Sequence, residues 1–379
     1  MYRRAFIKNL AALGLASCSP MLLGQTGSSN DRNGTQILAS AATDKQGQHW
    51  LALYKQVDKN LKSTLIRTPL PDRAHDVALQ PQGKMACAVA RRPGYYLLVV
   101  DTKDGSVLNH IEPETGFHFY GHGLFSHDGR YFLSCENHID SGEGYIIVRD
   151  CNDQFAISQR FPSYGIGPHQ LKWMPDNKTL VVANGGIRTH PHNSREKLNL
   201  ETMKPSLAYI NVQTGALTEQ RFLPAELHQL SIRHIDVSKK GEVFIGMQYQ
   251  GEAWHSVPLL AWHNRGQALQ TLWANDQDNP AMKNYCGSVC YDRSGKYAAA
   301  SAPKGNFVAF WDMHTKSYLG HVRNRDACGL ASLPGEGMFF ISNGAGKLQR
   351  YSVTDGFADK APEYDSEVLH WDNHLNIIG

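Results

Sequence analysis

The sequence lacks the motifs that would indicate a nucleotide-dependent or hydrolytic enzyme. It contains no P-loop, no glycine-rich dinucleotide fingerprint and no Gly-x-Ser-x-Gly nucleophile elbow. Its 7 cysteines include no Cys-x-x-Cys pair, so the sequence supports neither a zinc knuckle nor a thioredoxin-type motif. Runs of lysine and arginine are also missing, and the formal net charge is only +3, which argues against a nucleic-acid partner.

An apolar run of membrane-spanning length is absent as well. The apolar residues near the N-terminus fall short of the ~20 that a span needs, and they follow a twin Arg3-Arg4 and the sequence FIK. This pattern is typical of a twin-arginine export signal, which we predict over residues 1–25. We therefore expect a periplasmic protein.

A membrane link could come only from lipid. The sequence LASC at residues 15–18 resembles a lipobox, so Cys18 is either a lipidation site or part of an ordinary cleaved signal. Residues 26–35 are predicted to be a linker. The whole chain of 379 residues is 41% hydrophobic and 19% charged, which indicates a large folded core.

What the sequence does contain is a repeat. Tight-turn signals such as FSHDGRYFLSC and YDRSGKYAAAS each join two strand-like runs, and a second pair of runs follows each hairpin. Each unit therefore corresponds to four strands, the size of a propeller blade. The six turn positions are Gly83, Gly129, Asn177, Gly241, Gly295 and Gly337. Six blades are predicted after residue 74.

The two ends of the chain supply the seventh blade. Residues 36–73 provide about three strands and lack an innermost one, which would leave an open edge. The last apolar stretch, residues 372–378, is predicted to complete this first blade. The sequence therefore predicts an all-β fold, a seven-bladed β-propeller over residues 36–379 closed by its C-terminal strand.

Histidines recur where the inner strands begin. When positions are counted back from each turn residue, one histidine from each of five blades falls at the mouth of the central channel. These residues are His75, His122, His169, His234 and His374. Imidazoles that converge on one axis suit iron, copper or zinc, and we predict an iron or copper site. A single channel histidine bonded to a carbonyl would instead be structural.

Strand position separates these histidines into two sets. His75 and His169 lie one position earlier than His122 and His234, so alternation could turn one pair toward the axis and the other into a blade interface. We expect three or four to share a ligand, with His122, His234 and His374 the favoured core. Cys286 and Cys328 occupy the equivalent place in two further blades; a disulfide, a pair of metal ligands and neither remain open.

The loops on the same face carry basic and polar residues. Arg91, Arg92 and His190 are expected on this rim, and Arg233 beside the histidines is expected to anchor an anion. Glu136 is also expected there. The plain alternative is a solvated surface of mixed charge.

Several stretches resemble the domain-of-unknown-function family 1513. They are RRPG, ENHIDSGEG, NGGIRTHPHNSREKLN and the terminal DNHL, on a chain with a twin-arginine signal. The resemblance covers essentially the whole mature chain. It implies an exported seven-bladed propeller with a periplasmic role in iron acquisition, in company with imelysin-type iron-uptake proteins. It implies no catalytic residue, because the activity of the family is not established.

Three functions remain open from the sequence. The first is a protein that binds or handles iron or copper and attracts an anionic metal chelate or a partner protein. The second is an enzyme that uses a histidine as general base and an arginine clamp for a carboxylate at the same mouth. The third is a scaffold whose rim binds other proteins.

Overall fold

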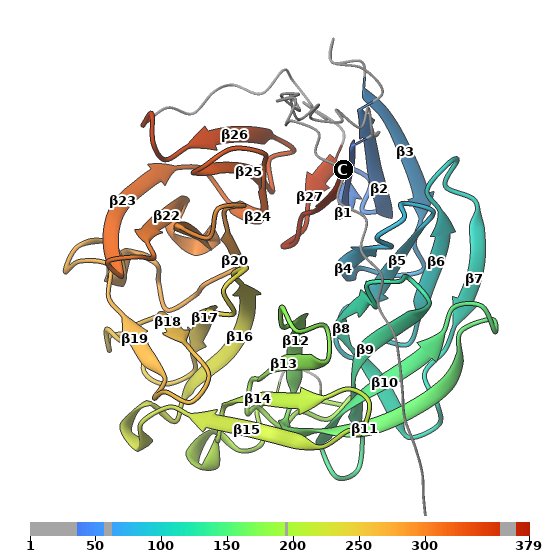
Figure 1. The fold of residues 1–379 in the computed structure, drawn as a ribbon, viewed down its shortest axis with the longest axis horizontal. Helices are drawn as coiled ribbons and strands as arrows, with labels where there is room; N and C mark the ends of the chain where they lie inside the picture. Colours follow the sequence, from blue (N-terminus) through green and yellow to red (C-terminus); the bar gives the residue numbers. More distant parts are fainter. Residues whose placement is uncertain (1–35, 57–62, 194–195, 357–368) are drawn as a thin grey trace, which may run out of the picture. The chain divides into compact units, whose positions relative to one another are not determined.

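Antiparallel strands make up nearly all of the regular structure. The computed structural model describes residues 36–56, 63–193, 196–356 and 369–379, all within the unit Thr35–Gly379. Seven sheets form a ring in this unit, the arrangement of a seven-bladed β-propeller (Figure 1). The predicted export signal, Cys18 and the linker lie outside the described residues.

Blades two to six each contain four consecutive strands. Blade two contains β4 (Ala74–Leu79), β5 (Met85–Ala90), β6 (Leu97–Asp101) and β7 (Val107–Ile111), and blade three contains β8 (Phe117–Phe125), β9 (Tyr131–His138), β10 (Glu143–Asp150) and β11 (Ala156–Ile166). Blade four contains β12 (Pro168–Trp173), β13 (Thr179–Asn184), β14 (Ser206–Asn211) and β15 (Leu217–Phe222), and blade five contains β16 (Leu230–Val237), β17 (Val243–Tyr249), β18 (Leu260–His263) and β19 (Gln270–Leu272). Blade six contains β20 (Ser288–Tyr291), β21 (Tyr297–Ala302), β22 (Phe307–Asp312) and β23 (Ser317–Arg323).

Blade seven and the helices complete the regular structure. Blade seven contains β24 (Ala327–Ser332), β25 (Met338–Asn343) and β26 (Leu348–Ser352), and its predicted fourth strand falls in 357–368, outside the described residues. Short helices lie in loops: η1 (Leu200–Thr202), η2 (Ala225–Leu227), α1 (Asp278–Ala281) and η3 (Pro303–Gly305). Among the described residues, no helix has the length and apolarity needed to cross a membrane.

The two chain ends build blade one together. β1 (Gln36–Asp44), β2 (His49–Gln56) and β3 (Ser63–Pro69) are joined on their inner side by β27 (Leu369–Trp371) and β28 (Asn376–Ile378), which both pair with β1. The predicted C-terminal closure is confirmed. The closing strand begins earlier than predicted and is interrupted at residues 372–375, the segment that carries His374.

Side chains tie the closing segment to blade two. The guanidinium of Arg73 binds both carboxylate oxygens of Asp372, at 2.5 and 2.8 Å. Asn376 donates from Nδ2 to Asp76 Oδ1 at 2.7 Å and to the Val77 carbonyl at 3.0 Å. The ring is therefore closed by charge-assisted bonds as well as by strand pairing.

The six predicted turns have the required backbone. Each joins the first and second strands of a blade, and each turn residue has a positive φ. Gly129 has a φ of 70°, and even the one non-glycine, Asn177, has a φ of 55°. Glycine and asparagine adopt this left-handed conformation at the lowest cost, which explains why they mark the repeat in the sequence.

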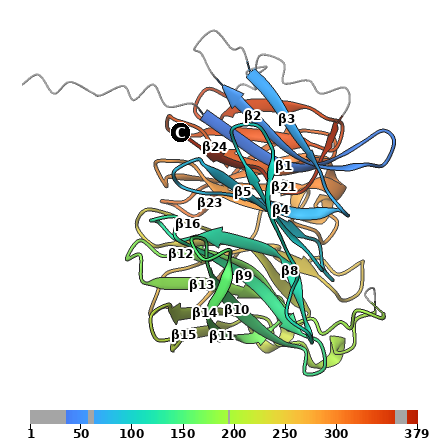
Figure 2. The same cartoon turned by 90° about the vertical axis from the view of Figure 1, so that its right-hand side faces the viewer.

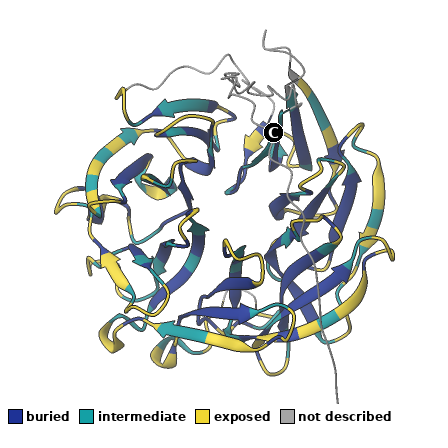
Figure 3. Cartoon of the chain, viewed as in Figure 1, coloured by how far each residue is buried: buried dark blue, intermediate teal, exposed yellow. Residues whose placement is uncertain are grey.

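The core lies between neighbouring blades. One apolar cluster joins blades one and two through residues such as Leu51 and Val77, and another joins blades seven and one through Phe340 and Trp371. The side view shows β1–β3 beside these neighbours (Figure 2). Inner strands are buried and outer strands are partly exposed, so the sheets pack face to face around the ring (Figure 3).

Removing the closing strand should unfold the protein. Truncation after Asp365 uncovers the inner edge of β1 and the apolar contacts of Trp371, so we expect loss of the cooperative melting transition. Arg73→Ala leaves the buried Asp372 carboxylate unpaired and should lower the free energy of unfolding by about 1–3 kcal/mol.

Arg130→Ala is the matched control for this measurement. Arg130 pairs with Asp150 at the surface, where water screens the two charges, so its loss should change the free energy of unfolding far less than Arg73→Ala does. A truncated chain with the melting temperature of the full chain would contradict the closure argument.

Candidate metal centre

Bulges in the inner strands coincide with the histidines. Pairing with the second strand shifts register across His75 in β4, around His122 in β8, across His169 in β12 and just before His234 in β16. In blade one, the equivalent position is that of His374, which lies in the interruption between β27 and β28. A bulge adds an unpaired residue and redirects a side chain, so each inner strand can turn an imidazole toward the axis.

The five histidines form one cluster. Eight pairs of their rings have centroids 4.5–6.0 Å apart, with His122 and His374 closest at 4.5 Å. The expectation that alternation could turn one pair of these histidines into a blade interface is wrong, because both pairs lie in the cluster. Strict alternation holds only in an unbroken strand, and the bulges break it.

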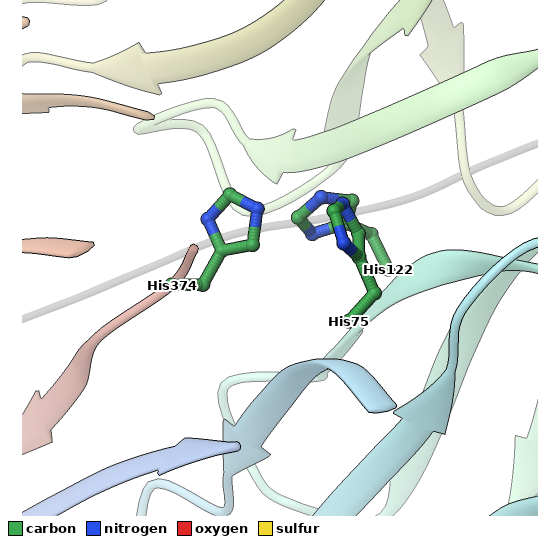
Figure 4. A group of neighbouring side chains, drawn as sticks. All are labelled: His75, His122 and His374. Atoms are coloured by element: carbon green, nitrogen blue, oxygen red, sulfur yellow. The ribbon is translucent and has the colours of Figure 1, made fainter. Parts of the chain in front are cut away.

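Two overlapping groups of three bring ligand atoms together. His75, His122 and His374 form the first group, and His122, His169 and His234 form the second; within each, one nitrogen per ring lies within 4.8 Å of the others. Figure 4 shows the first group, with His374 reaching the other two rings from the closing segment. The predicted core of His122, His234 and His374 is thus divided between two groups.

Buried ring nitrogens in this cluster lack partners. Within the described part of the chain, six such atoms make no hydrogen bond: both nitrogens of His75, Nε2 of His122, His169 and His374, and Nδ1 of His234. An unsatisfied buried polar atom costs about 1–3 kcal/mol. Six such atoms in one cluster make it a candidate binding site.

Asp76 orients His122 for coordination. The Asp76 Oδ2 atom lies 2.9 Å from His122 Nδ1, and both side chains are buried. Burial would raise the pKa of Asp76, but the charge and hydrogen bond of His122 outweigh it and lower that pKa. The carboxylate therefore holds the proton on Nδ1, which leaves the Nε2 lone pair of His122 free, as in carboxylate–histidine–metal arrangements.

His169 has the opposite arrangement. Arg233 Nη1 lies 3.4 Å from its Nδ1. Because a guanidinium only donates, neutral His169 accepts at Nδ1 and carries its proton on Nε2. That tautomer has no free lone pair at Nε2. The tautomers therefore favour the group of His75, His122 and His374 over the group that contains His169.

Four of the five histidines are neutral at physiological pH. Burial lowers the pKa of His75, His169 and His234 well below the ordinary value, and neighbouring charges add to the effect. Burial and the charge of His122 lower the pKa of His374 to about 3. Neutral imidazole is the form that coordinates metals, so the lowered pKa values keep these side chains in the protonation state that can bind a metal.

A small pocket of about 170 Å³ adjoins the cluster. His75, His169 and His234 contribute to its lining. Three predicted site residues, Arg91, Arg92 and Arg233, line it too, together with the neutral side chains of Tyr120, Gln248, Tyr285 and Asn373. The structure thus brings the predicted arginines and histidines to one place.

His190 is not among the residues that line this pocket. It lies in the loop after β13, where its ring is 4.9 Å from that of His192. Glu136 is expected on the rim from the sequence, but it does not lie there. It is buried beneath the face, where Oε1 binds Arg149 Nη1 at 2.6 Å, so its charge is used inside blade three.

Cys286 and Cys328 are both free and buried. Their thiols lie near backbone carbonyls, Cys286 Sγ 3.6 Å from Ser288 O and Cys328 Sγ 3.0 Å from Asp326 O. Burial raises the pKa of both thiols, which disfavours the thiolate needed to bind a metal. Three alternatives were open from the sequence, and the structure favours the third, in which Cys286 and Cys328 form neither a disulfide nor a pair of metal ligands.

Sequence reasoning missed Asp76 and Asn376 as members of the site. A signal for Asp76 existed, because it occupies the same position in its inner strand as His122 and His234 in theirs. Asn376 carries no such signal; its role follows from the pairing of the closing segment with blade one.

The family of the chain follows from its sequence match. A family model described as "Protein of unknown function (DUF1513)" matches residues 68–378. The chain belongs to the DUF1513 family. No curated protein matches this DUF1513 sequence.

Among solved structures, the chain is similar to hydrazine synthase of Kuenenia stuttgartiensis, at 15% sequence identity and a TM-score of 0.60. The match covers 82% of this chain and 94% of that one. At this identity the likeness shows a shared fold alone.

Metal-free protein should lose stability as the pH falls below about 6.5. The lowered pKa values mean that the unfolded chain binds more protons than the folded chain below that pH, so the free energy of unfolding decreases. Denaturant unfolding at several pH values between about 7.5 and 5 measures the slope.

The double variant H169Q/H234Q removes two of these groups. Its slope should be smaller than that of the wild type by up to two protons per molecule, roughly 2.7 kcal/mol per pH unit. H110Q, which replaces an exposed histidine of β7 outside the cluster, is the control. Equal slopes for all three proteins would contradict the neutral cluster.

Proposed function

We propose that this DUF1513 protein binds one transition-metal ion, iron or copper, through His75, His122 and His374. The observation that carries the proposal is the convergence of these imidazoles with buried, unpartnered nitrogens, one of them oriented by Asp76. Imidazole nitrogens favour metals of this kind, whereas calcium and magnesium prefer oxygen.

The proposed stoichiometry, one metal ion per chain, follows from the position of His122. Both groups of three need this residue, and its Nδ1 is already bonded to Asp76, so a single nitrogen remains for a metal. The two groups are therefore alternatives that cannot be filled together. Three protein nitrogens would leave coordination positions open for an external ligand, as in catalytic and transport sites.

The general-base and scaffold alternatives account for less of the structure. A general base works best with a pKa near the working pH, but burial lowers the pKa of His75, His169 and His234 well below it. A scaffold would leave the cost of the unpartnered nitrogens uncompensated. A bound metal would be a partner for the unpartnered nitrogens, and it needs the neutral imidazoles that the lowered pKa values provide.

Metal analysis of the loaded protein tests this function. After anaerobic loading with Fe²⁺, Cu²⁺ or Zn²⁺ and gel filtration, the wild type should retain about one ion per chain. His122→Ala removes one ligand and the double variant H75A/H374A removes two, so both should lose affinity by more than about 100-fold. H169A/H234A should retain the ion.

His110→Ala is the control, since this histidine is exposed on an outer strand. Melting curves of every variant separate loss of metal from loss of fold. Unchanged metal content in His122→Ala, or no retained metal in the wild type, would overturn the proposal. Selective retention of zinc would keep the site and reject iron and copper.

We further propose that the protein acts in the periplasm in iron acquisition, with an imelysin-type protein as partner. The support is the twin Arg3-Arg4 pattern and the family resemblance. The double substitution R3K/R4K should leave unprocessed protein in the cytoplasm, as cell fractionation would measure. Mature periplasmic protein from that variant would show another route, and palmitate labelling tests Cys18 separately.

A further inference from the structure

Three arginines surround a pocket that has no carboxylate in its lining. Arg91, Arg92 and Arg233 come from blades two and five, and the remaining lining side chains are histidines or neutral polar groups. None of the three arginines forms an ion pair with a residue in the described ranges. Asp372, whose charge acts on Arg91, is already paired with Arg73.

Two of these guanidiniums are held in place by neutral partners. Arg92 Nη1 donates to the Tyr120 hydroxyl at 2.9 Å, and its guanidinium lies 5.2 Å from the centre of the Tyr120 ring. Arg233 Nε donates to Ser231 Oγ at 3.0 Å. These bonds orient the guanidiniums without neutralising them, which is the preparation expected for an external anion.

No acidic side chain in the lining of the pocket compensates the positive charge of its arginines. Burial and the charge of Arg92 lower the pKa of Arg233 to about 10, so Arg233 remains charged at neutral pH. The adjoining histidines are neutral and contribute no opposite charge. A bound metal ion would add further positive charge beside the arginines, so the site calls for a ligand with more than one negative charge.

We propose that this pocket binds a small polycarboxylate that also coordinates the metal held by the histidines. The proposal rests on the function proposed above and names the class of ligand. A guanidinium matches a carboxylate through two parallel hydrogen bonds, and carboxylate oxygens are common metal ligands. One molecule with several carboxylates can therefore contact an arginine and the metal together.

The size of the pocket limits the ligand. The pocket has a volume of about 170 Å³. A small molecule with a few carboxylates matches a pocket of this size. The neutral groups of Gln248, Tyr285 and Asn373 can bind a hydroxyl or a carboxylate oxygen that the arginines do not reach.

Citrate and inorganic phosphate are suitable probes. Titration calorimetry should show citrate binding to the metal-free wild type and binding at least about 10-fold tighter to metal-loaded protein. The double variant R91Q/R92Q should weaken citrate binding to metal-free protein by roughly 10- to 100-fold. Arg323→Gln, an exposed arginine on β23 outside the pocket, should bind citrate like the wild type.

The outcomes separate this inference from the metal proposal. Citrate binding to metal-free protein that depends on Arg91 and Arg92 supports the anion site even if no metal is retained. Retained metal with no citrate binding, or phosphate bound more tightly than citrate, overturns the polycarboxylate assignment and leaves the metal site standing. Removal of the metal by stoichiometric citrate would overturn joint coordination.

Discussion

The carboxylate of Asp76 connects the closure of the ring to the candidate metal centre. Its Oδ2 binds His122 of blade three, and its Oδ1 accepts a bond from Asn376 of the closing segment. Asp76 itself belongs to β4 of blade two. One buried acidic side chain therefore joins three blades, and its carboxylate oxygens have these hydrogen-bond partners only if all three are in register.

This connection gives the closing strand a second role. The chain ends in a segment that completes blade one and also supplies His374, while the Ser40 hydroxyl of β1 donates to the His374 carbonyl at 2.6 Å. The ligand is thus positioned by the element that closes the fold. A metal bound to His75, His122 and His374 would link blades one, two and three, and its binding energy would add to the stability of the ring.

Much of the fold could be predicted because its signals are local. The turn residues need a positive φ that glycine and asparagine provide, and an unpaired first blade requires a closing strand. The convergence of the histidines on one axis could be anticipated from their shared strand position. Which of them share a group could not, because bulges at His75 and His169 cancel the alternation that a regular strand would impose.

Other features depend on partners that are distant in sequence. The tautomers of His122 and His169 are set by Asp76 and Arg233, and the sequence does not show these pairings. Glu136 was expected on the rim from its loop position, but Arg149 binds it inside the blade. Electrostatic surroundings of this kind are decided by tertiary contacts.

The central claim is that buried imidazoles hold a metal at the axis of the propeller. X-ray absorption at the metal edge of loaded protein tests it most directly, because this measurement reports ligand type and distance. The account predicts about three imidazole nitrogens at roughly 2.0–2.1 Å, with the remaining positions filled by oxygen. A spectrum with sulfur ligands, or with oxygen ligands alone, would contradict it.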